Sequence, residues 1–143
     1  MDDPRAALLA EARGWIGTPY RHQASVRGAG CDCLGLIRGL WRACHGAEPE
    51  PPPAYGPDWA ESRGDEALWQ ALGRLLRPAG PVPLPGDVLL FRMRAGSVAK
   101  HLGILSAVGP SPRFIHAYSG HGVVESPLSR PWARRIVARF DLT

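Results

Sequence analysis

Three residues far apart in the chain have side chains suited to nucleophilic chemistry: Cys33, His101 and His116. Cys33 follows Gly30 and Asp32 and opens an apolar run with helical spacing, so its thiol is expected at the start of a helix. Outward-pointing amides and the helix dipole favour an anion there, which predicts a lowered pKa for this thiol. A cysteine, a basic histidine and a group that orients the base are the components of a thiol hydrolase.

The remaining cysteines and histidines have simpler interpretations. Cys44 falls on the apolar stripe of the helix that Cys33 opens and is interpreted as a packed thiol. Cys31 lies in the preceding turn, too close to Cys33 for an ordinary structural disulfide, so at least one thiol is expected to be free. Three histidines lie in segments without a supporting pattern and are interpreted as surface residues: His22, His45 and His121.

Residue types alone leave two kinds of site open. His101 begins one expected strand and His116 ends the next, so antiparallel pairing could bring both imidazoles together and complete a triad with Cys33. Zinc is the competing interpretation, because the cysteines and histidines include enough soft ligands. The spacing argues against zinc, since a single residue separates Cys31 from Cys33 whereas structural zinc pairs usually have roughly two to four between them. We therefore expect chemistry that needs no metal and no cofactor.

Helices are expected first along the chain and strands afterwards. Helical spacing of apolar residues predicts helices over about 4–15, 33–44 and 60–76, the first capped by Asp3. Gly35 and Gly39 lie inside the second helix, where a closely packed neighbour such as a sheet would compensate for them. The proline-rich segment 47–58 is expected to be extended. Short apolar runs between glycines and prolines predict strands over 87–93, 102–108, 113–118, 122–125 and 135–140. This order predicts an α+β domain with an antiparallel sheet.

Length and composition place the chain among globular proteins. Its 143 residues suit one domain spanning 1–143. The net charge of +4, from 17 basic and 13 acidic residues, is too weak and scattered to indicate nucleic-acid binding. The N-terminus lacks the pattern of a signal peptide, and no apolar stretch is long enough to cross a bilayer. We expect a product made in the cytoplasm without membrane insertion.

Five short motifs occur in the order found in NlpC-type cell-wall cysteine peptidases, which the chain resembles over about residues 15–118. They are GTPY at 17–20, DCLGL at 32–36, PGDVLLF at 85–91, HLGI at 101–104 and FIHA at 114–117. Five ordered motifs are far more specific than any single one. The resemblance implies a papain-like fold, in which N-terminal helices, one carrying the cysteine, pack on a C-terminal antiparallel sheet.

The resemblance also implies roles for individual residues. Cys33 corresponds to the nucleophile, His101 to the base and His116 to the residue that orients the base. Tyr20 matches a tyrosine near the catalytic centre, although a packed aromatic after a turn is equally compatible with its position. Asp32 matches an acid that in several members receives the free amine of the substrate, and it could equally cap the helix through backbone amides.

The expected substrate is the stem peptide of peptidoglycan, cleaved between the γ-carboxyl of D-glutamate and diaminopimelate. One residue departs from the family pattern, because Leu34 stands where members usually carry a serine that often contributes to the substrate pocket. Two other functions use the same scaffold: an amidase or acyltransferase, and a structural tail-tip subunit with a vestigial site.

Within the family, the chain looks most like the branch encoded with phage tails and gene-transfer agents. The features that carry this resemblance are the DCLGL form of the cysteine motif, the short domain and the segment 55–59, YGPDW. It implies a tail-tip or baseplate protein as a partner. The enzyme would then be incorporated in a phage-like tail and act in the periplasm or cell wall of a target cell.

Overall fold

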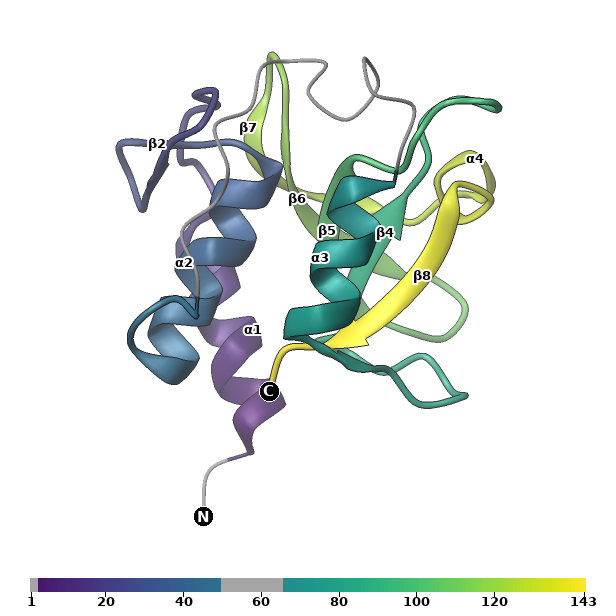
Figure 1. Cartoon of the computed structure of the whole chain (residues 1–143), viewed down its shortest axis with the longest axis horizontal. Coiled ribbons are helices and arrows are strands. Elements are labelled where there is room, and N and C mark those ends of the chain that lie inside the picture. The colour runs from purple at the N-terminus through teal and green to yellow at the C-terminus, as the bar shows by residue number, and fades with distance from the viewer. Residues whose placement is uncertain (1–2, 50–65) are drawn as a thin grey trace.

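The computed structural model describes residues 3–49 and 66–143, which form helices and an antiparallel sheet (Figure 1). The helices are α1 (Pro4–Gly14), α2 (Cys33–His45), α3 (Ala67–Leu75) and α4 (Arg130–Ala133). The strands are β1 (Ser25–Val26), β2 (Gly30–Cys31), β3 (Arg77–Pro78), β4 (Val88–Phe91), β5 (His101–Ala107), β6 (Arg113–Tyr118), β7 (Gly122–Pro127) and β8 (Ile136–Asp141). Within the described ranges, no helix has the length and apolar character needed to cross a membrane.

The main sheet has six strands in the order β3-β8-β4-β5-β6-β7, and every neighbouring pair is antiparallel. β1 and β2 form a separate small hairpin directly before α2. α2 packs on β5 and β6 and lies beside α1, so the helix that begins at Cys33 covers the centre of the sheet.

Most of the expected elements are confirmed. Asp3 caps α1 by accepting a hydrogen bond from the amide of Arg5 at 3.0 Å. α3 begins at Ala67, and residues 60–65 of the expected third helix lie outside the described residues, as does the expected extended segment from residue 50 onward. Sequence periodicity missed β1, β2, β3 and α4, because two to four residues are too few to establish a period.

Alternate residues of the central strands face opposite sides of the sheet, as the pleat requires. One face packs against the helices in the larger apolar core, to which the sheet contributes Val88, Leu90, Leu102, Ile104, Ile115, Ala117 and Phe140. The other face carries a smaller cluster of Leu89, Phe91, Leu105 and Phe114, packed against Trp132 of α4. The imidazoles of His101 and His116 contact this smaller cluster, with ring centroids 5.5 Å from Phe91 and 4.2 Å from Phe114 respectively.

The two glycines inside α2 permit close contacts with a loop and a tryptophan. A β-carbon on Gly35 would lie 1.8 Å from the carbonyl oxygen of Ala24, and one on Gly39 would lie 2.1 Å from the ring of Trp15. The expectation of a close neighbour is therefore confirmed, but a sheet as that neighbour is wrong. The contacts lock the first turns of α2 against the 21–30 loop and against the residue that follows α1.

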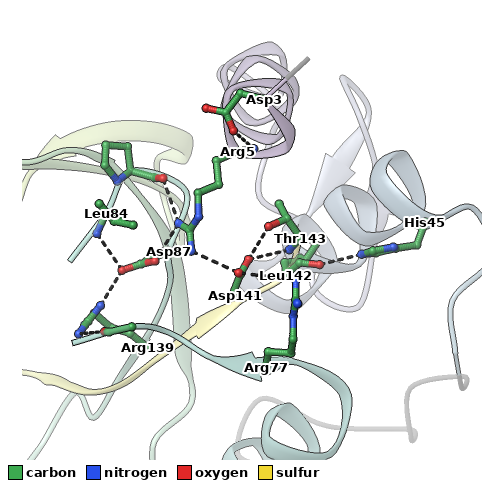
Figure 2. Close-up of polar contacts among 12 residues, drawn as sticks. Asp3, Arg5, His45, Arg77, Leu84, Asp87, Arg139, Asp141, Leu142 and Thr143 are labelled. Carbon is green, nitrogen blue, oxygen red and sulfur yellow. Dashed lines mark hydrogen bonds and ion pairs between the residues drawn. The ribbon is translucent and has the colours of Figure 1, made fainter. Parts of the chain in front are cut away.

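A buried carboxylate joins three separate parts of the fold (Figure 2). Asp87 is 1% exposed, and its Oδ1 accepts a hydrogen bond from Arg5 of α1 at 2.9 Å. Its Oδ2 accepts hydrogen bonds from Arg139 of β8 at 2.7 Å and from the amide of Leu84 at 3.0 Å. The aspartate of the PGDVLLF motif thus has a structural role, because it fixes α1 and the turn before β4 against β8.

Candidate active site

Cys33 is the first residue of α2, and the helix start is held by Asp32 as N-cap. Asp32 Oδ1 accepts a hydrogen bond from the Gly35 amide at 2.7 Å, and Oδ2 accepts one from the Gln23 amide, also at 2.7 Å. The residue is 3% exposed. The capping interpretation of Asp32 is therefore confirmed, and contact with a substrate amine stays a prediction.

The thiol of Cys33 lies beside the strand end that carries His101. The side chain is half-buried, and Sγ donates a hydrogen bond to the carbonyl oxygen of Lys100 at 3.5 Å. Burial raises the pKa of Cys33 to about 12, with a further increase from the Asp32 carboxylate, while backbone amides at the helix start and at Leu102 act in the opposite direction. The predicted lowering of this pKa is wrong, because desolvation outweighs the amides at the helix terminus.

His101 and His116 are in direct hydrogen-bond contact. The Nε2 atom of His101 lies 2.8 Å from Nδ1 of His116, and Nε2 of His116 lies 3.0 Å from Oγ of Ser126. The two imidazoles are 8% and 1% exposed. Burial lowers the pKa of His101 to about 3, with an added effect of His116, and lowers that of His116 to about 4, with an added effect of His121. Both rings are thus neutral near pH 7, and each offers one nitrogen lone pair as an acceptor.

The pairing of β5 with β6 creates this contact, as the sequence predicts. Gly103 makes the close approach possible: a β-carbon there would lie 3.0 Å from the Phe114 ring and 3.3 Å from the β-carbon of His116. A larger residue at this position would push β6 side chains away from His101. The glycine of the HLGI motif therefore contributes to the geometry of the histidine pair.

Trp132 forms an aromatic wall beside both histidines. Its ring centroid lies 5.5 Å from that of His101 and 5.1 Å from that of His116. Tyr118 adds a second ring, 5.3 Å from His116, and His121 stacks on Tyr118 at 5.2 Å. The sequence did not predict a role for Trp132 or Ser126, because neither belongs to a recognised motif and α4 has too few residues for a periodic signal.

Tyr20 is attached to the residues immediately before α2. The amide of Cys31 donates to the carbonyl of Pro19 at 3.0 Å, and the amide of Arg21 donates to the carbonyl of Cys31 at 3.0 Å. Burial raises the pKa of Tyr20 to about 12, and the electrostatic influence of Cys33 adds to the increase. The phenol therefore lies within electrostatic range of the thiol, and its assistance to catalysis stays a prediction.

Cys31, Cys44 and His45 lie outside the contact between His101 and His116. All three cysteines are free thiols, Cys31 fully buried and Cys44 exposed. The packed environment expected for Cys44 is wrong, because the last turn of α2 is open to solvent. His45 lies in that turn and its Nε2 contacts the carbonyl oxygen of Leu142 at 2.7 Å. Among residues 3–49 and 66–143, no three or more histidine, cysteine or acidic side chains are grouped to hold a metal ion.

Two proteins are similar to the chain in sequence. Gamma-DL-glutamyl hydrolase of Bacillus subtilis strain 168 is 31% identical over 145 residues, which cover 97% of this chain and 31% of that protein. Probable endopeptidase NlpC of Escherichia coli K12 is 27% identical over 124 residues, which cover 86% of this chain and 68% of that protein. The chain thus spans about one third of the first relative and about two thirds of the second. No protein-family model matches the chain.

Solved structures show the same fold. The NlpC/p60 domain of the peptidoglycan hydrolase SagA matches with a TM-score of 0.63 and 21% identity, covering 96% of this chain and 97% of that domain. A lipoprotein-like NLP/P60 protein of Staphylococcus aureus matches with a TM-score of 0.64 and 20% identity, covering 99% of this chain and 42% of that protein. The predicted α+β fold, with N-terminal helices on a C-terminal antiparallel sheet, is confirmed. The chain is therefore similar in sequence to a gamma-DL-glutamyl hydrolase and a probable endopeptidase, and similar in fold to NlpC/P60 domains.

Proposed function

We propose that the chain is a cysteine endopeptidase that cleaves the stem peptide of peptidoglycan between the γ-carboxyl of D-glutamate and diaminopimelate. The observations that carry the proposal are the 2.8 Å contact between His101 and His116 and the 3.5 Å contact of Cys33 Sγ with the carbonyl oxygen of Lys100, the residue before His101. The similar proteins support the substrate class, since one is a gamma-DL-glutamyl hydrolase and another a probable endopeptidase.

The histidine contact defines which nitrogen serves as the base. Nε2 of His101 is engaged by His116, so Nδ1 is the nitrogen that takes the proton of Cys33. The S–H bond breaks, its electron pair remains on sulfur, and sulfur attacks the substrate carbonyl. His101 then donates the proton to the leaving amine, and water hydrolyses the thioester.

The free site holds a neutral thiol and a neutral imidazole. The pKa of Cys33 is raised to about 12 and that of His101 is lowered to about 3, so an ion pair is unfavourable before the substrate enters. The thiol also donates to the Lys100 carbonyl in this state, and must turn from it toward Nδ1. Proton transfer is therefore expected to accompany attack on the carbonyl. In the proposed reaction, the amide of Cys33 stabilises the oxyanion that forms, and Tyr20 assists.

The decisive experiment replaces the nucleophile. Cys33→Ala should reduce release of stem-peptide fragments from purified peptidoglycan to background, as measured by mass spectrometry, while circular dichroism shows a folded protein. Cys44→Ser is the matched control, since it changes an exposed thiol at the opposite end of the same helix. Fragment release by Cys33→Ala at the rate of the parent protein would overturn the proposal.

The chemical identity of the products distinguishes the proposed reaction from the two enzymatic alternatives. A new amine on diaminopimelate indicates the proposed endopeptidase. A free sugar-lactyl product indicates an amidase, and transfer of an acyl group to an added amine indicates an acyltransferase. Leu34 bears on the subsites, because it is half-buried directly after Cys33 and offers no hydroxyl to a substrate.

We further propose that a phage tail or gene-transfer-agent particle carries the enzyme to the cell wall, through contact with a tail-tip or baseplate protein. The support is the DCLGL form of the cysteine motif together with segment 55–59, which lies outside the described residues. Mass spectrometry of purified particles should detect the protein, and its absence would remove this part of the proposal. Particles carrying Cys33→Ala should assemble normally and deliver DNA poorly. Unchanged delivery would favour a structural tail-tip subunit instead.

A further inference from the structure

The hydrogen-bonded pair of His101 and His116 continues to a serine, and these three residues form one row of contacts. Ser126 lies on β7, paired with Phe114 of β6, and its Oγ is 3.0 Å from Nε2 of His116. His116 is 1% exposed, so this hydroxyl satisfies a ring nitrogen that solvent does not reach. Ser126 itself is half-buried.

Two proton arrangements are compatible with these distances, because a neutral imidazole has one donor and one acceptor nitrogen. In the first, His116 donates from Nε2 to Ser126 and accepts at Nδ1 from Nε2 of His101. The Nδ1 atom of His101 then carries a lone pair. In the second, every donor and acceptor is exchanged, and Nδ1 of His101 carries a proton. Only the first arrangement lets His101 accept the proton of Cys33.

Proton transfer makes the first arrangement obligatory. After His101 takes the proton, both of its nitrogens are donors, so Nδ1 of His116 must accept. The proton of His116 is then on Nε2, where the described structure provides Oγ of Ser126 as acceptor at 3.0 Å. Without an acceptor there, a buried N–H would remain unsatisfied in the state that catalysis must pass through.

We propose that Ser126 is a positioning residue that accepts a hydrogen bond from His116 and thereby stabilises the proton arrangement in which His101 can accept the proton of Cys33. The inference rests on the proposed cysteine-hydrolase function, and deepens it by one residue. In this role Ser126 acts through His116 and not through contact with the substrate or the sulfur.

The kinetic test compares variants at position 126. Ser126→Ala should lower kcat about 10- to 100-fold, by analogy with the loss seen when a partner that orients a metal-binding histidine is removed. KM should change little, because the substrate does not contact the serine. Thr and Val have nearly the same shape and differ in the hydroxyl, so Ser126→Thr should keep most of kcat and Ser126→Val should lose it. This pair preserves the test if Ser126→Ala does not fold.

Ser106→Ala is the matched control. Ser106 is a buried serine on β5, and its hydroxyl donates to Glu125 Oε2 at 2.7 Å. This contact does not involve His101, His116 or Ser126. The kcat of Ser106→Ala should stay close to that of the parent protein. An equal loss of kcat in Ser106→Ala and Ser126→Ala would overturn the inference, since it would reflect a general disturbance of the sheet.

Nitrogen NMR of the imidazole rings supplies a readout that does not depend on catalysis. In the parent protein, His101 and His116 should both be protonated on Nε2, and Ser126→Ala should shift the signals toward protonation on Nδ1. An inactive parent protein would contradict the proposed function while leaving this measurement valid. An active parent whose kcat and nitrogen signals are the same in Ser126→Ala would overturn the role of Ser126 alone. A loss of kcat with unchanged nitrogen signals would overturn it as well.

Discussion

The cluster around Asp87 and the His101–His116 pair are two buried polar sites in the same sheet, and they meet the cost of burial in different ways. Asp87 and His116 are each 1% exposed. Asp87 forms ion pairs with the guanidinium groups of Arg5 and Arg139, at 2.9 and 2.7 Å. The two histidines contact each other and the neutral hydroxyl of Ser126, and burial keeps both rings uncharged.

The difference separates a site that holds the fold from a site that can move a proton. Opposite charges around Asp87 favour one arrangement of α1, β4 and β8, since any other leaves a buried charge without its partner. Neutral imidazoles can exchange donor and acceptor roles without moving a heavy atom. The first kind of site gives rigidity, and the second gives chemistry.

The largest expected effect falls on the histidine pair. His101→Ala should lower kcat by about 10²- to 10⁴-fold, the contribution of a general base, with the protein still folded. Steady-state cleavage of a γ-glutamyl-diaminopimelate peptide measures this. His121→Ala is the control, because it removes an exposed ring that stacks on Tyr118 outside the contact with His101. A kcat within a factor of two of the parent would contradict the assignment of the base.

Removing the charge at Asp87 should have the opposite profile. Asp87→Asn removes the buried carboxylate that Arg5 and Arg139 share, so the free energy of unfolding should fall by about 3–5 kcal/mol. The kcat of the folded fraction should stay near that of the parent. Urea titration with parallel activity assays measures both quantities. Asp141→Asn is the comparison, since its ion pairs with Arg5 and Arg77 are longer, at 3.5 and 3.8 Å, and should contribute less than about 1 kcal/mol.

Acid should weaken the fold through the histidine pair. The folded-state pKa values of about 3 and about 4 lie below the unfolded value of about 6.5, so below pH 6.5 the unfolded chain binds protons that the folded chain does not. The free energy of unfolding should therefore fall as pH decreases from about 6.5 to 4, by up to about 1.4 kcal/mol per pH unit for each ring. Urea titrations at several pH values measure the slope.

A glutamine at position 116 tests the source of that slope. His116→Gln removes one titrating ring and keeps hydrogen-bonding groups, so the slope between pH 6.5 and 4 should be reduced. An unchanged slope would assign the acid sensitivity to other groups, such as carboxylates whose pKa is lowered by ion pairs, including Glu48 and Glu125.

The smallest effect distinguishes the two interpretations of Asp32. Asparagine also caps helices, so Asp32→Asn should cost less stability than Asp32→Ala, for which about 1–2 kcal/mol is expected. If the carboxylate also receives a substrate amine, Asp32→Asn should raise KM while the melting temperature changes little. Asp3→Ala is the control, because Asp3 caps α1 at an exposed position. An unchanged KM in Asp32→Asn would leave Asp32 with the capping role alone.

Much of the fold could be predicted because its signals are local. Apolar spacing and the caps at Asp3 and Asp32 determine α1 and the start of α2. The short elements could not be predicted, since β3 has two residues and α4 has four. The environment of Cys44 was predicted wrongly for a related reason. Helical periodicity gives the direction of a side chain, but it does not show how far along the helix other elements cover that side chain from solvent.

The candidate site divides in the same way. The motifs placed a cysteine at a helix start and histidines on adjacent antiparallel strands, and both placements are confirmed. The Ser126 contact and the wall formed by Trp132 were not foreseen, because they depend on residues that meet only when β7 and α4 fold back onto β6.

The sequence by itself therefore determined which residues can do chemistry and which elements carry them, since residue type and periodicity are properties of neighbouring positions. Only the tertiary structure decided the protonation of those residues. The helix terminus predicts an acidic Cys33, but the packing of distant strands around it raises its pKa, and the same burial keeps His101 neutral. Desolvation depends on everything that surrounds a group, and the chain brings those surroundings together only when it folds.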